Sequence, residues 1–425
     1  MRILQVVQGF PPESIAGTEL YCQALTRALQ DRGHHCFVLA GSKQQAKAPA
    51  LVTTDEEGIC VTRYVSPLPL EWRERQIDPY SPEAELLLRQ HLETRRPDLI
   101  HVHHWLRLTD NIVFVASQLG IPAIVTLHDL WTSCARFHRQ HRLGHFCRES
   151  PSPSLCESCV ERYPWQGDAE VRLAIELRQE QIAEELRLAH CILVPSETHG
   201  QLVSALLRLS PDRLRVVPHG SVVRFSPHRD NELPRFPHRP LRLAYWGYLV
   251  HFKGVHLLLE ATRQLKDRSA VEVLLAGPAP DPGYFKYLQG LAEGLSVKFI
   301  GEYRQADLAS LDVDMAVFPS LAHESYGFVL DEAFQLRLPV IVSDRGALPT
   351  RVGEAGLVFS AGDSAALASR IQEVLDAPSL FEDMRKKVPV FPSPSMAEHA
   401  QAMEAVYEES RRVTPPLSKS VHIEP

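Results

Sequence analysis

Two carboxylates stand eight positions apart in the stretch HESYGFVLDEA, residues 323–333. An apolar run that ends at Pro319 precedes them, and the pattern predicts a helix that begins between 325 and 327. Glu324 would then lie at the mouth of this helix and Glu332 about two turns into it. Ligands of open parallel sheets bind beyond the carboxyl ends of the strands, where helix N-termini present N–H groups and a positive dipole. The stretch is therefore a candidate ligand site.

The two acids favour a phosphorylated, hydroxyl-rich ligand over a metal ion. The backbone amides of Gly327 and Phe328 would hold its phosphates, as helix N-termini do. Glu324 and Glu332 would accept hydrogen bonds from sugar or ribose hydroxyls. Spacing alone also fits a plainer interpretation, in which both acids are solvated side chains that the helix dipole favours near an N-terminus.

A second group of residues that could do chemistry is rich in cysteine. Cys134, Cys147, Cys156 and Cys159 are separated by twelve, eight and two residues. The closing C-x2-C is a spacing typical of structural zinc sites. Three histidines that could replace one cysteine lie between the first two: His138, His141 and His145. The segment has few large apolar residues, so we hypothesise a structural zinc ion that orders it; reduced cysteines without a metal are the alternative.

The histidine-rich run HVHHW, residues 101–105, also resembles a metal site. It ends an apolar strand, and successive side chains of a strand point to opposite faces of the sheet. We therefore interpret these histidines as structural.

The elements that must position these residues follow an α/β rhythm. Short β-branched runs alternate with helix-period segments from Met1 onward, which predicts a parallel sheet with helices on both faces, and a second series repeats the architecture. A stretch rich in proline and charge divides the two series. We expect an N-terminal domain over 1–224, with a Cys-rich insertion at about 134–165, and a C-terminal domain over 241–394, joined by a linker over 225–240. A last helix over 395–412 should pack back across the boundary between the domains, and a disordered tail should follow over 413–425.

Composition excludes several classes of protein. The 425 residues, 44% of them hydrophobic, suffice for two domains. A formal net charge of −7 gives no sign of nucleic-acid binding. No window approaches a membrane span or a signal segment, so we expect a soluble, cytoplasmic protein. Eight cysteines in a chain of this length predict reduced thiols rather than a disulfide scaffold.

The order of six short motifs resembles one enzyme family. They are GTEL (17–20), TLHD (126–129), VPHG (217–220), FKG (252–254), HESYGFVLDEA (323–333) and GDSAALA (362–368). The sequence is similar to the retaining GT-B glycosyltransferases, most closely family 4, the glycosyl transferases group 1, whose E-x7-E motif matches Glu324 and Glu332. The resemblance implies two Rossmann-like domains that face each other across a cleft, with the nucleotide-sugar donor on the C-terminal domain and the acceptor on the N-terminal one.

The family's roles carry over to matching positions. The resemblance implies that Glu324 holds the donor sugar's hydroxyls, that Glu332 binds the ribose and that Lys253 neutralises the diphosphate leaving group. It also implies that His128 lies near the transferred sugar and the acceptor, and that Gly17 lets the backbone approach the phosphates. Catalytic roles would then belong to His128, Lys253 and Glu324.

Two positions depart from the family pattern. Tyr248 stands where an arginine usually precedes the lysine, so the diphosphate clamp would lose one cation; Arg304, Arg345 and Arg351 are candidate substitutes. Ala16 replaces the first glycine of the N-terminal loop, which still permits the turn if its φ is negative.

The reaction implied is transfer of a sugar, with retention, from a UDP- or GDP-sugar to a glycan, lipid-linked or small-molecule acceptor, without a catalytic metal. Assembly of polysaccharide or glycolipid at the inner face of a membrane would suit such an enzyme, so peripheral membrane contact stays open. The alternative is a sugar-nucleotide-binding scaffold without turnover, which only the missing arginine favours. A dinucleotide-dependent oxidoreductase fits less well, because no strand is followed by G-x-G-x-x-G.

Overall fold

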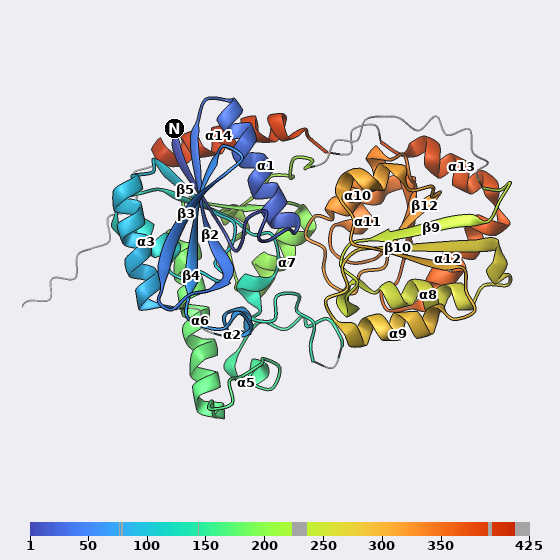
Figure 1. The fold of residues 1–425 in the computed structure, drawn as a ribbon, viewed down its shortest axis with the longest axis horizontal. Coiled ribbons are helices and arrows are strands. Elements are labelled where there is room, and N and C mark those ends of the chain that lie inside the picture. Colours follow the sequence, from blue (N-terminus) through green and yellow to red (C-terminus); the bar gives the residue numbers. More distant parts are fainter. Residues whose placement is uncertain (76, 78–79, 143, 223–235, 390–392, 413–425) are drawn as a thin grey trace, which may run out of the picture. The chain divides into compact units, whose positions relative to one another are not determined.

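The chain is divided into two compact units. The computed structural model describes residues 1–425 except 76, 78–79, 143, 223–235, 390–392 and 413–425. Unit 1 comprises Met1–Val222 with Pro394–Pro425, and unit 2 comprises Val223–Ser393. Each unit is a parallel α/β sheet of its own (Figure 1).

Unit 1 is built on an eight-stranded sheet of order β3-β4-β2-β1-β5-β6-β7-β8. Neighbouring strands are parallel except β3 and β4, which form an antiparallel edge pair. The central strands are buried on both faces and read as continuous apolar runs, as strands covered by helices do. The strands are β1 (Arg2–Val7), β2 (His35–Gln45), β3 (Ala50–Glu56), β4 (Ile59–Ser66), β5 (Leu99–Val102), β6 (Ala123–Thr126), β7 (Cys191–Val194) and β8 (Leu214–Val216).

Several helices of unit 1 begin at serine residues that cap their N-termini. The side chain of Ser81 accepts the N–H of Ala84, and that of Ser196 accepts the N–H of His199. The helices are α1 (Gly17–Asp31), α2 (Leu70–Arg75), α3 (Pro82–Arg95), α4 (Ile112–Gln118), α5 (Pro153–Cys156), α6 (Asp168–Leu188), α7 (Glu197–Leu207) and α14 (Met396–Arg412), with 3-10 turns at Trp131–Ser133 and Pro211–Arg213.

The last helix, α14, belongs to unit 1 although unit 2 precedes it in the chain. Figure 1 shows α14, in red, beside α1, in blue, and the two helices are in contact. One face of α14 buries Ala400, Met403, Val406 and Tyr407. The chain therefore passes from unit 1 to unit 2 and returns.

Unit 2 contains a six-stranded parallel sheet of order β11-β10-β9-β12-β13-β14. Its strands are β9 (Leu241–Trp246), β10 (Val271–Ala276), β11 (Val297–Gly301), β12 (Met315–Phe318), β13 (Val340–Ser343) and β14 (Gly356–Phe359). Its helices are α8 (Val255–Arg263), α9 (Pro282–Ala292), α10 (Phe328–Gln335), α11 (Leu348–Val352), α12 (Ser364–Asp376) and α13 (Pro378–Lys387), with 3-10 turns at His251–Lys253, Arg268–Ala270, Gln305–Ser310 and Gly353–Ala355.

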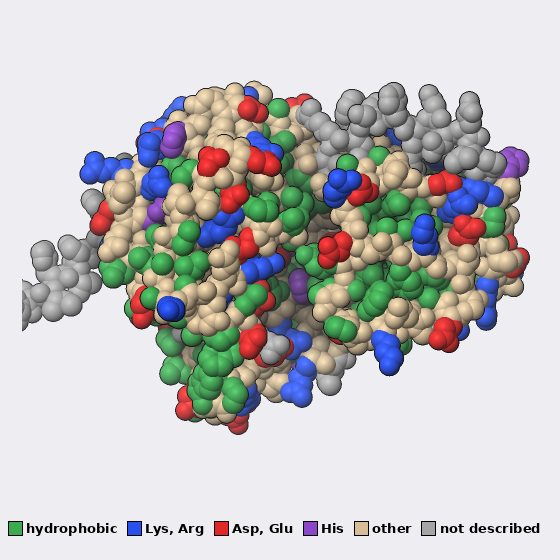
Figure 2. Space-filling model, viewed as in Figure 1, with side chains coloured by type: hydrophobic (Ala, Val, Ile, Leu, Met, Phe, Trp, Pro, Cys, Tyr) green, Lys and Arg blue, Asp and Glu red, His purple; other side chains and the backbone are tan. Residues whose placement is uncertain are grey.

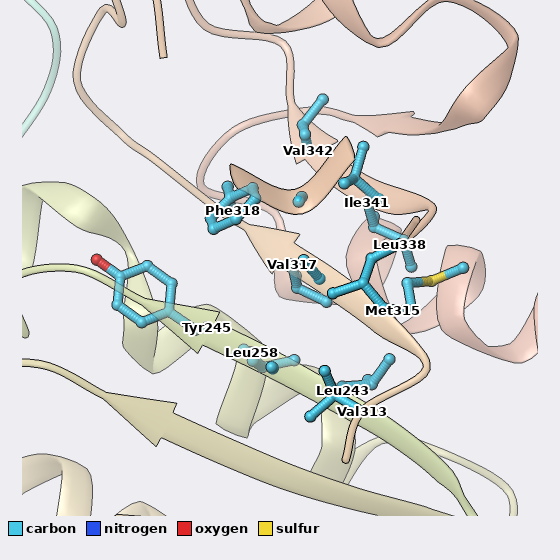
Figure 3. Packing of buried hydrophobic residues seen from close by; sticks show 14 of the residues in the cluster. Leu243, Tyr245, Leu258, Val313, Met315, Val317, Phe318, Leu338, Ile341 and Val342 are labelled. Atoms are coloured by element: carbon cyan, nitrogen blue, oxygen red, sulfur yellow. The ribbon is translucent and has the colours of Figure 1, made fainter. Parts of the chain in front are cut away.

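The core of unit 2 surrounds its three central strands. Figure 3 shows Leu243 and Tyr245 of β9 beside Val317 and Phe318 of β12, with Ile341 of β13 behind them. These side chains are at most 4% exposed. The rigid centre fixes the carboxyl ends of β9 and β12, from which the candidate site is built.

The division differs from the sequence-based prediction at the linker. Phe236 is 7% exposed and packs against Phe381 of α13, with ring centroids 5.6 Å apart. Residues 236–240 are therefore part of unit 2 rather than of a linker, because the ring of Phe236 is buried in the core. The rest of the predicted linker, residues 225–235, and the predicted tail, residues 413–425, lie outside the described residues.

Among the described helices, none combines the length and the apolar character that crossing a membrane requires. Figure 2 shows acidic and basic side chains interspersed over the visible face rather than gathered by sign.

Candidate active site

The turn that carries Lys253 is held against the end of β12 by a glycine. Gly254 has a φ of +69°, and a Cβ at this position would lie only 1.9 Å from the carbonyl oxygen of Pro319. Only glycine fits both the left-handed backbone and this close approach. In the same turn, the carbonyl oxygen of Phe252 accepts hydrogen bonds from the N–H groups of Leu321 and Ala322. The FKG turn and the loop after β12 are therefore one packed unit.

Glu324 and Lys253 form an ion pair across this junction. Glu324 Oε1 lies 2.7 Å from Lys253 Nζ and accepts a hydrogen bond of 2.8 Å from Ser320 Oγ. The side chains are 17% and 32% exposed, so both can still reach a ligand. Behind them, Gly346 lies so close that a Cβ would come within 2.0 Å of Glu324 O. The glycine after β13 thus fixes the backbone of Glu324.

Glycine also sets the start of α10. Gly327 is the N-cap residue with a φ of +83°, and the helix begins at Phe328. The positive end of the helix dipole is therefore four residues beyond Glu324, where an anion would be stabilised. The predicted start, between 325 and 327, was early by one to three residues, because the left-handed Gly327 precedes the helix rather than opening it.

Glu332 is a buried acid with two donors. It is 5% exposed; Trp246 Nε1 donates to Oε2 at 2.6 Å and Gln305 Nε2 donates to Oε1 at 2.9 Å. Burial raises the pKa of Glu332 to about 7, although both hydrogen bonds oppose that rise. The plainer interpretation of Glu332 as a solvated helix acid is wrong, because the side chain is turned toward the end of β9.

The ends of β9 and β10 approach closely beside Glu332. Trp246 is the last residue of β9, and Gly247 follows it with a φ of +126°. A Cβ on Gly277, just after β10, would lie 1.9 Å from Gly247 O. This leaves backbone rather than side chains at the two strand ends, the arrangement that lets phosphates approach an open sheet.

Four residues of this site were missed by sequence reasoning: Trp246, Gln305, Ser320 and Gly346. They come from different strands and loops and meet the two glutamates only in the folded chain. The Trp-Gly pair at the carboxyl end of the first strand of unit 2 could have indicated Trp246, since residues at the carboxyl ends of parallel strands face ligands.

Two of the three candidate replacements for the missing arginine serve structure. Arg304 pairs with Asp307 at 3.0 Å in its own turn, and its side chain is 87% exposed. Arg351 pairs with Asp331, donates to Gly327 O at 3.1 Å and stacks on the ring of Tyr326.

Arg345 is placed differently, because it directly precedes Gly346 and so lies next to the backbone of Glu324. Its Nη1 is 3.5 Å from Asp344, and its buried Nε has no hydrogen-bond partner among the described residues. Arg345 also contributes to the low pKa of His323, which burial mainly brings to about 4. Tyr248, at the family's arginine position, is 40% exposed.

In unit 1, His128 lies within a line of buried histidines. Its Nε2 is 3.0 Å from His103 Nδ1, its Nδ1 is 3.1 Å from His219 Nε2, and His103 Nε2 is 2.7 Å from Gln5 Oε1. Burial, and then the neighbouring His103, hold the pKa of His128 well below its usual range. The two histidine neighbours hold the ring in one orientation, and the lowered pKa favours its neutral form.

The run HVHHW is structural, as predicted. His101, His103, His104 and Trp105 are at most 3% exposed. His101 lies 2.8 Å from Tyr407 Oη of α14 and 2.7 Å from Thr126 Oγ1. His101 therefore connects the central strands β5 and β6 of unit 1 to its last helix.

The N-terminal loop reaches α1 through an alanine. Ala16 is the N-cap residue with φ −146° and ψ 179°, so the condition under which this substitution permits the turn, a negative φ, is met. Gly17 is the first residue of the helix.

The predicted cysteine group converges in the folded chain. Cys134, Cys147, Cys156 and Cys159 all line one cavity of about 40 Å³ in unit 1, and all four thiols are free. Burial raises the pKa of Cys156, and the nearby thiols of Cys134 and Cys147 add to that rise.

Comparisons with known proteins agree with this architecture. The family description Glycosyltransferase Family 4 matches residues 15–225, and Glycosyl transferases group 1 matches residues 240–377. The D-inositol 3-phosphate glycosyltransferase of Corynebacterium jeikeium (strain K411) is 26% identical over 345 residues, which cover 73% of this chain and 72% of the relative. The glycogen synthase of Mycobacterium tuberculosis (strain CDC 1551 / Oshkosh) is 24% identical over 404 residues, 89% of this chain and 87% of the relative.

Solved structures share the fold at low sequence identity. Sucrose-phosphate synthase from Thermosynechococcus elongatus superposes with a TM-score of 0.67 at 21% identity, covering 96% of this chain and 99% of that one. Anabaena Alr3699/HepE in complex with UDP superposes with a TM-score of 0.65 at 17% identity, covering 96% and 100%.

Two parallel-sheet α/β units with this arrangement of strand ends define the GT-B class of glycosyltransferase. The chain belongs to glycosyltransferase family 4, the glycosyl transferases group 1. It is accordingly a glycosyltransferase.

Proposed function

We propose that this glycosyltransferase takes a sugar from a nucleotide diphosphate sugar and transfers it, with retention at the anomeric carbon, to an acceptor hydroxyl in glycan or glycolipid assembly. The observation that carries the proposal is the Lys253–Glu324 ion pair beside the N-terminus of α10, with Glu332 buried on the next turn of that helix. Similar structures of Anabaena Alr3699/HepE hold UDP and UDP-glucose, which supports a nucleotide-sugar donor here.

Each charged group has a distinct task in this proposal. Glu324 accepts hydrogen bonds from hydroxyls of the donor sugar, and Glu332 accepts them from the ribose. Lys253 faces the diphosphate, whose negative charge grows as the glycosidic bond breaks. The phosphates also meet the N-terminal amides of α10, beginning with Gly327 and Phe328, where the helix dipole favours anions.

Arg345 supplies the cation that Tyr248 does not. Arg345 comes just after β13 in the chain and directly before Gly346, whose backbone packs against that of Glu324. Its Nε is buried without a hydrogen-bond partner among the described residues. A guanidinium suits a diphosphate because it can donate two parallel hydrogen bonds. With Lys253 and Arg345 together, the charge of the leaving group is neutralised without a divalent metal.

Transfer with retention requires the acceptor to attack the face from which the diphosphate departs. When the acceptor attacks that face as the diphosphate departs, no carboxylate nucleophile is needed. The departing phosphate oxygen takes the acceptor's proton. Glu324 is bound to Lys253 and Ser320 and acts as a ligand of the sugar. In unit 1, the neutral His128 helps to position the acceptor side rather than to move a proton, because both of its ring nitrogens face histidines.

A donor screen tests the proposal. Thermal shifts are measured with UDP-, GDP- and ADP-sugars, and a donor present at 100 times its Kd should stabilise the protein by about 2.7 kcal/mol. Nucleotide release is then followed with glycan, lipid-linked and small-molecule acceptors, with and without added Mg²⁺. Binding of one donor class with metal-independent turnover is the expected result. Binding without release by any acceptor would indicate a scaffold instead, and failure of every donor to bind would contradict the proposed site.

A further inference from the structure

We propose that Cys134, Cys147, Cys156 and Cys159 bind one structural zinc ion that holds the Cys-rich insertion of unit 1 in place. This inference is independent of the donor and acceptor proposed above. It rests on the convergence of the four thiols, on polar groups around them that lack partners, and on how the insertion is otherwise held.

The four cysteines line one cavity although they are far apart in the chain. Cys134 follows the 3-10 turn at Trp131–Ser133, and Cys147 follows a loop closed by a bridge between Gln140 and Phe146. Cys156 is the last residue of α5 and Cys159 lies in the turn after it. All of them line the same cavity of about 40 Å³. A cavity of about 10–15 Å³ suffices for one water molecule, so this one has room for a metal ion. Four cysteines are the ligand set of a closed, tetrahedral zinc site.

Hydrogen bonds to backbone carbonyls already hold the loops that carry the cysteines near one another. Arg139 donates to Cys147 O at 2.9 Å and to Ser133 O at 2.6 Å, and Arg136 donates to Cys159 O at 3.0 Å. Cys159 N donates to Cys156 O at 2.9 Å, which closes the C-x2-C turn. Arginine side chains thus hold the loops that carry the thiols, and little apolar burial does so.

The apolar support beneath the insertion is limited. Phe137 and Phe146 pack against the main core of unit 1. The local cluster consists of Ile77, Val171 and Ile175, with Cys156, Val160 and Ala174 packed against it. Segments that bury so little apolar surface are commonly ordered by a metal or by disulfides. Since all four thiols are free, a metal is the remaining cross-link.

Polar groups around the cavity are suited to surround a metal–thiolate centre. Both amide atoms of Gln140 and Nε2 of Gln179 are buried without hydrogen-bond partners among the described residues, and both side chains line the cavity. N–H groups that face coordinating thiolates are typical of such sites. Arg139 Nη2 already lies 3.6 Å from Cys147 Sγ. A zinc ion with four thiolates keeps a net negative charge, which Arg136, Arg139 and Arg178 at the cavity would offset.

Filling the site requires the thiols to turn inward. Within the described part of the chain, no three potential ligands already stand together as a metal-binding group. Rotation of a cysteine side chain about χ1 changes the position of its sulfur without moving the backbone. Of the histidines between the first two cysteines, His141 lines the cavity and is the one that could replace a thiolate.

The zinc ion would also stabilise the segment that follows His128. Arg178 of α6 lines the cavity, donates to Trp131 O and lies over the Trp131 ring, 4.4 Å from its centroid. Trp131 N in turn donates to Asp129 Oδ1 at 2.8 Å. The metal would therefore order the turn between β6 and the insertion without taking part in transfer.

Elemental analysis of the full-length protein, purified without chelator from zinc-supplemented cells, tests the inference. About one zinc per chain is expected for the wild type, and Cys156→Ser and Cys159→Ser should lose the metal and melt at lower temperature. Cys60→Ser, on β4 and away from the cavity, is the matched control and should keep the zinc ion and the wild-type melting temperature.

A second measurement covers the case in which the serine variants do not fold. Wild-type protein reloaded with Co²⁺ should show the intense absorption of tetrahedral cobalt thiolates. Zinc near zero in protein whose eight thiols all titrate as free would overturn the inference. Mapping of disulfides among the same four cysteines would overturn it as well.

Discussion

Lys253 Nζ lies 2.7 Å from Glu324 Oε1, so the cation proposed for the leaving group is already oriented by the acid proposed for the sugar. The pair joins two segments 71 residues apart in the chain, and Gly254 and Gly346 pack the backbone behind each partner. Removing either side chain should therefore change the orientation of the other.

Lys253→Ala should reduce turnover more than it weakens donor binding. The lysine stabilises charge that develops only as the glycosidic bond breaks, and loss of one such donor costs about 100- to 1000-fold in kcat. Steady-state kinetics and donor affinity by calorimetry check this. Lys266→Ala is the control, because Lys266 is an exposed lysine of the same unit paired with Asp376. An unchanged kcat with a raised KM would contradict the role.

Glu332→Gln should weaken binding of every sugar carried on the same nucleotide. In the wild type, Glu332 has a pKa of about 7, and the carboxylate accepts hydrogen bonds better than the protonated acid. Nucleotide affinity should accordingly fall as the pH is lowered from about 8 to 6, and the variant should lose this dependence. Nucleotide titrations across this range measure it; the same pH profile in both proteins would refute the ribose role.

Arg345→Ala should lower kcat about tenfold or more if Arg345 replaces the missing arginine, because one cation would be lost from the diphosphate. Arg304→Ala is the matched control, since Arg304 is an exposed arginine of unit 2 paired within its own turn. Equal activity of the two variants would remove Arg345 from the clamp.

The buried histidines should make the protein less stable in mild acid. Burial lowers the pKa of His399 to about 4 from an ordinary value of 6.5, so the unfolded chain takes up a proton in this range and the folded chain does not. His399 then contributes full stability above pH 6.5 and loses roughly 3 kcal/mol as the pH falls to about 4. Urea unfolding at several pH values should show a smaller acid loss for His399→Gln, which can still bond Tyr21 Oη. Parallel profiles would be inconsistent with this explanation.

Much of the fold was predictable because its signals are local. The alternation of strand and helix patterns predicted two parallel α/β units, and the structure has two. The glycine at 254 likewise indicated a turn at Lys253, and the end of the apolar strand β12 indicated a loop that carries Glu324.

The rest of the site depends on contacts between distant segments. The burial of Glu332 follows from Trp246 and Gln305, which come from other elements of unit 2, so the spacing of the two acids could not show it. His128 could be placed at the end of a strand, yet its two histidine neighbours come from β5's end and from the loop after β8. All three of Arg304, Arg345 and Arg351 lie near a carboxylate. Choosing among them also required knowing that Arg345 has a buried Nε without a hydrogen-bond partner among the described residues.

The return of α14 to unit 1 makes unit 2 a domain inserted within another domain. The two places where the chain leaves and re-enters unit 1 lie together, since Ser221 N donates to Pro394 O at 2.9 Å and Ser221 forms a parallel bridge with Ser395. A gene in which a short glycine-serine bridge joins residue 222 to residue 394 should thus encode a closed unit 1 that keeps its last helix. Simple truncation after residue 222 should fail, because it would strip Tyr407 from His101 and expose the α1 surface that α14 covers.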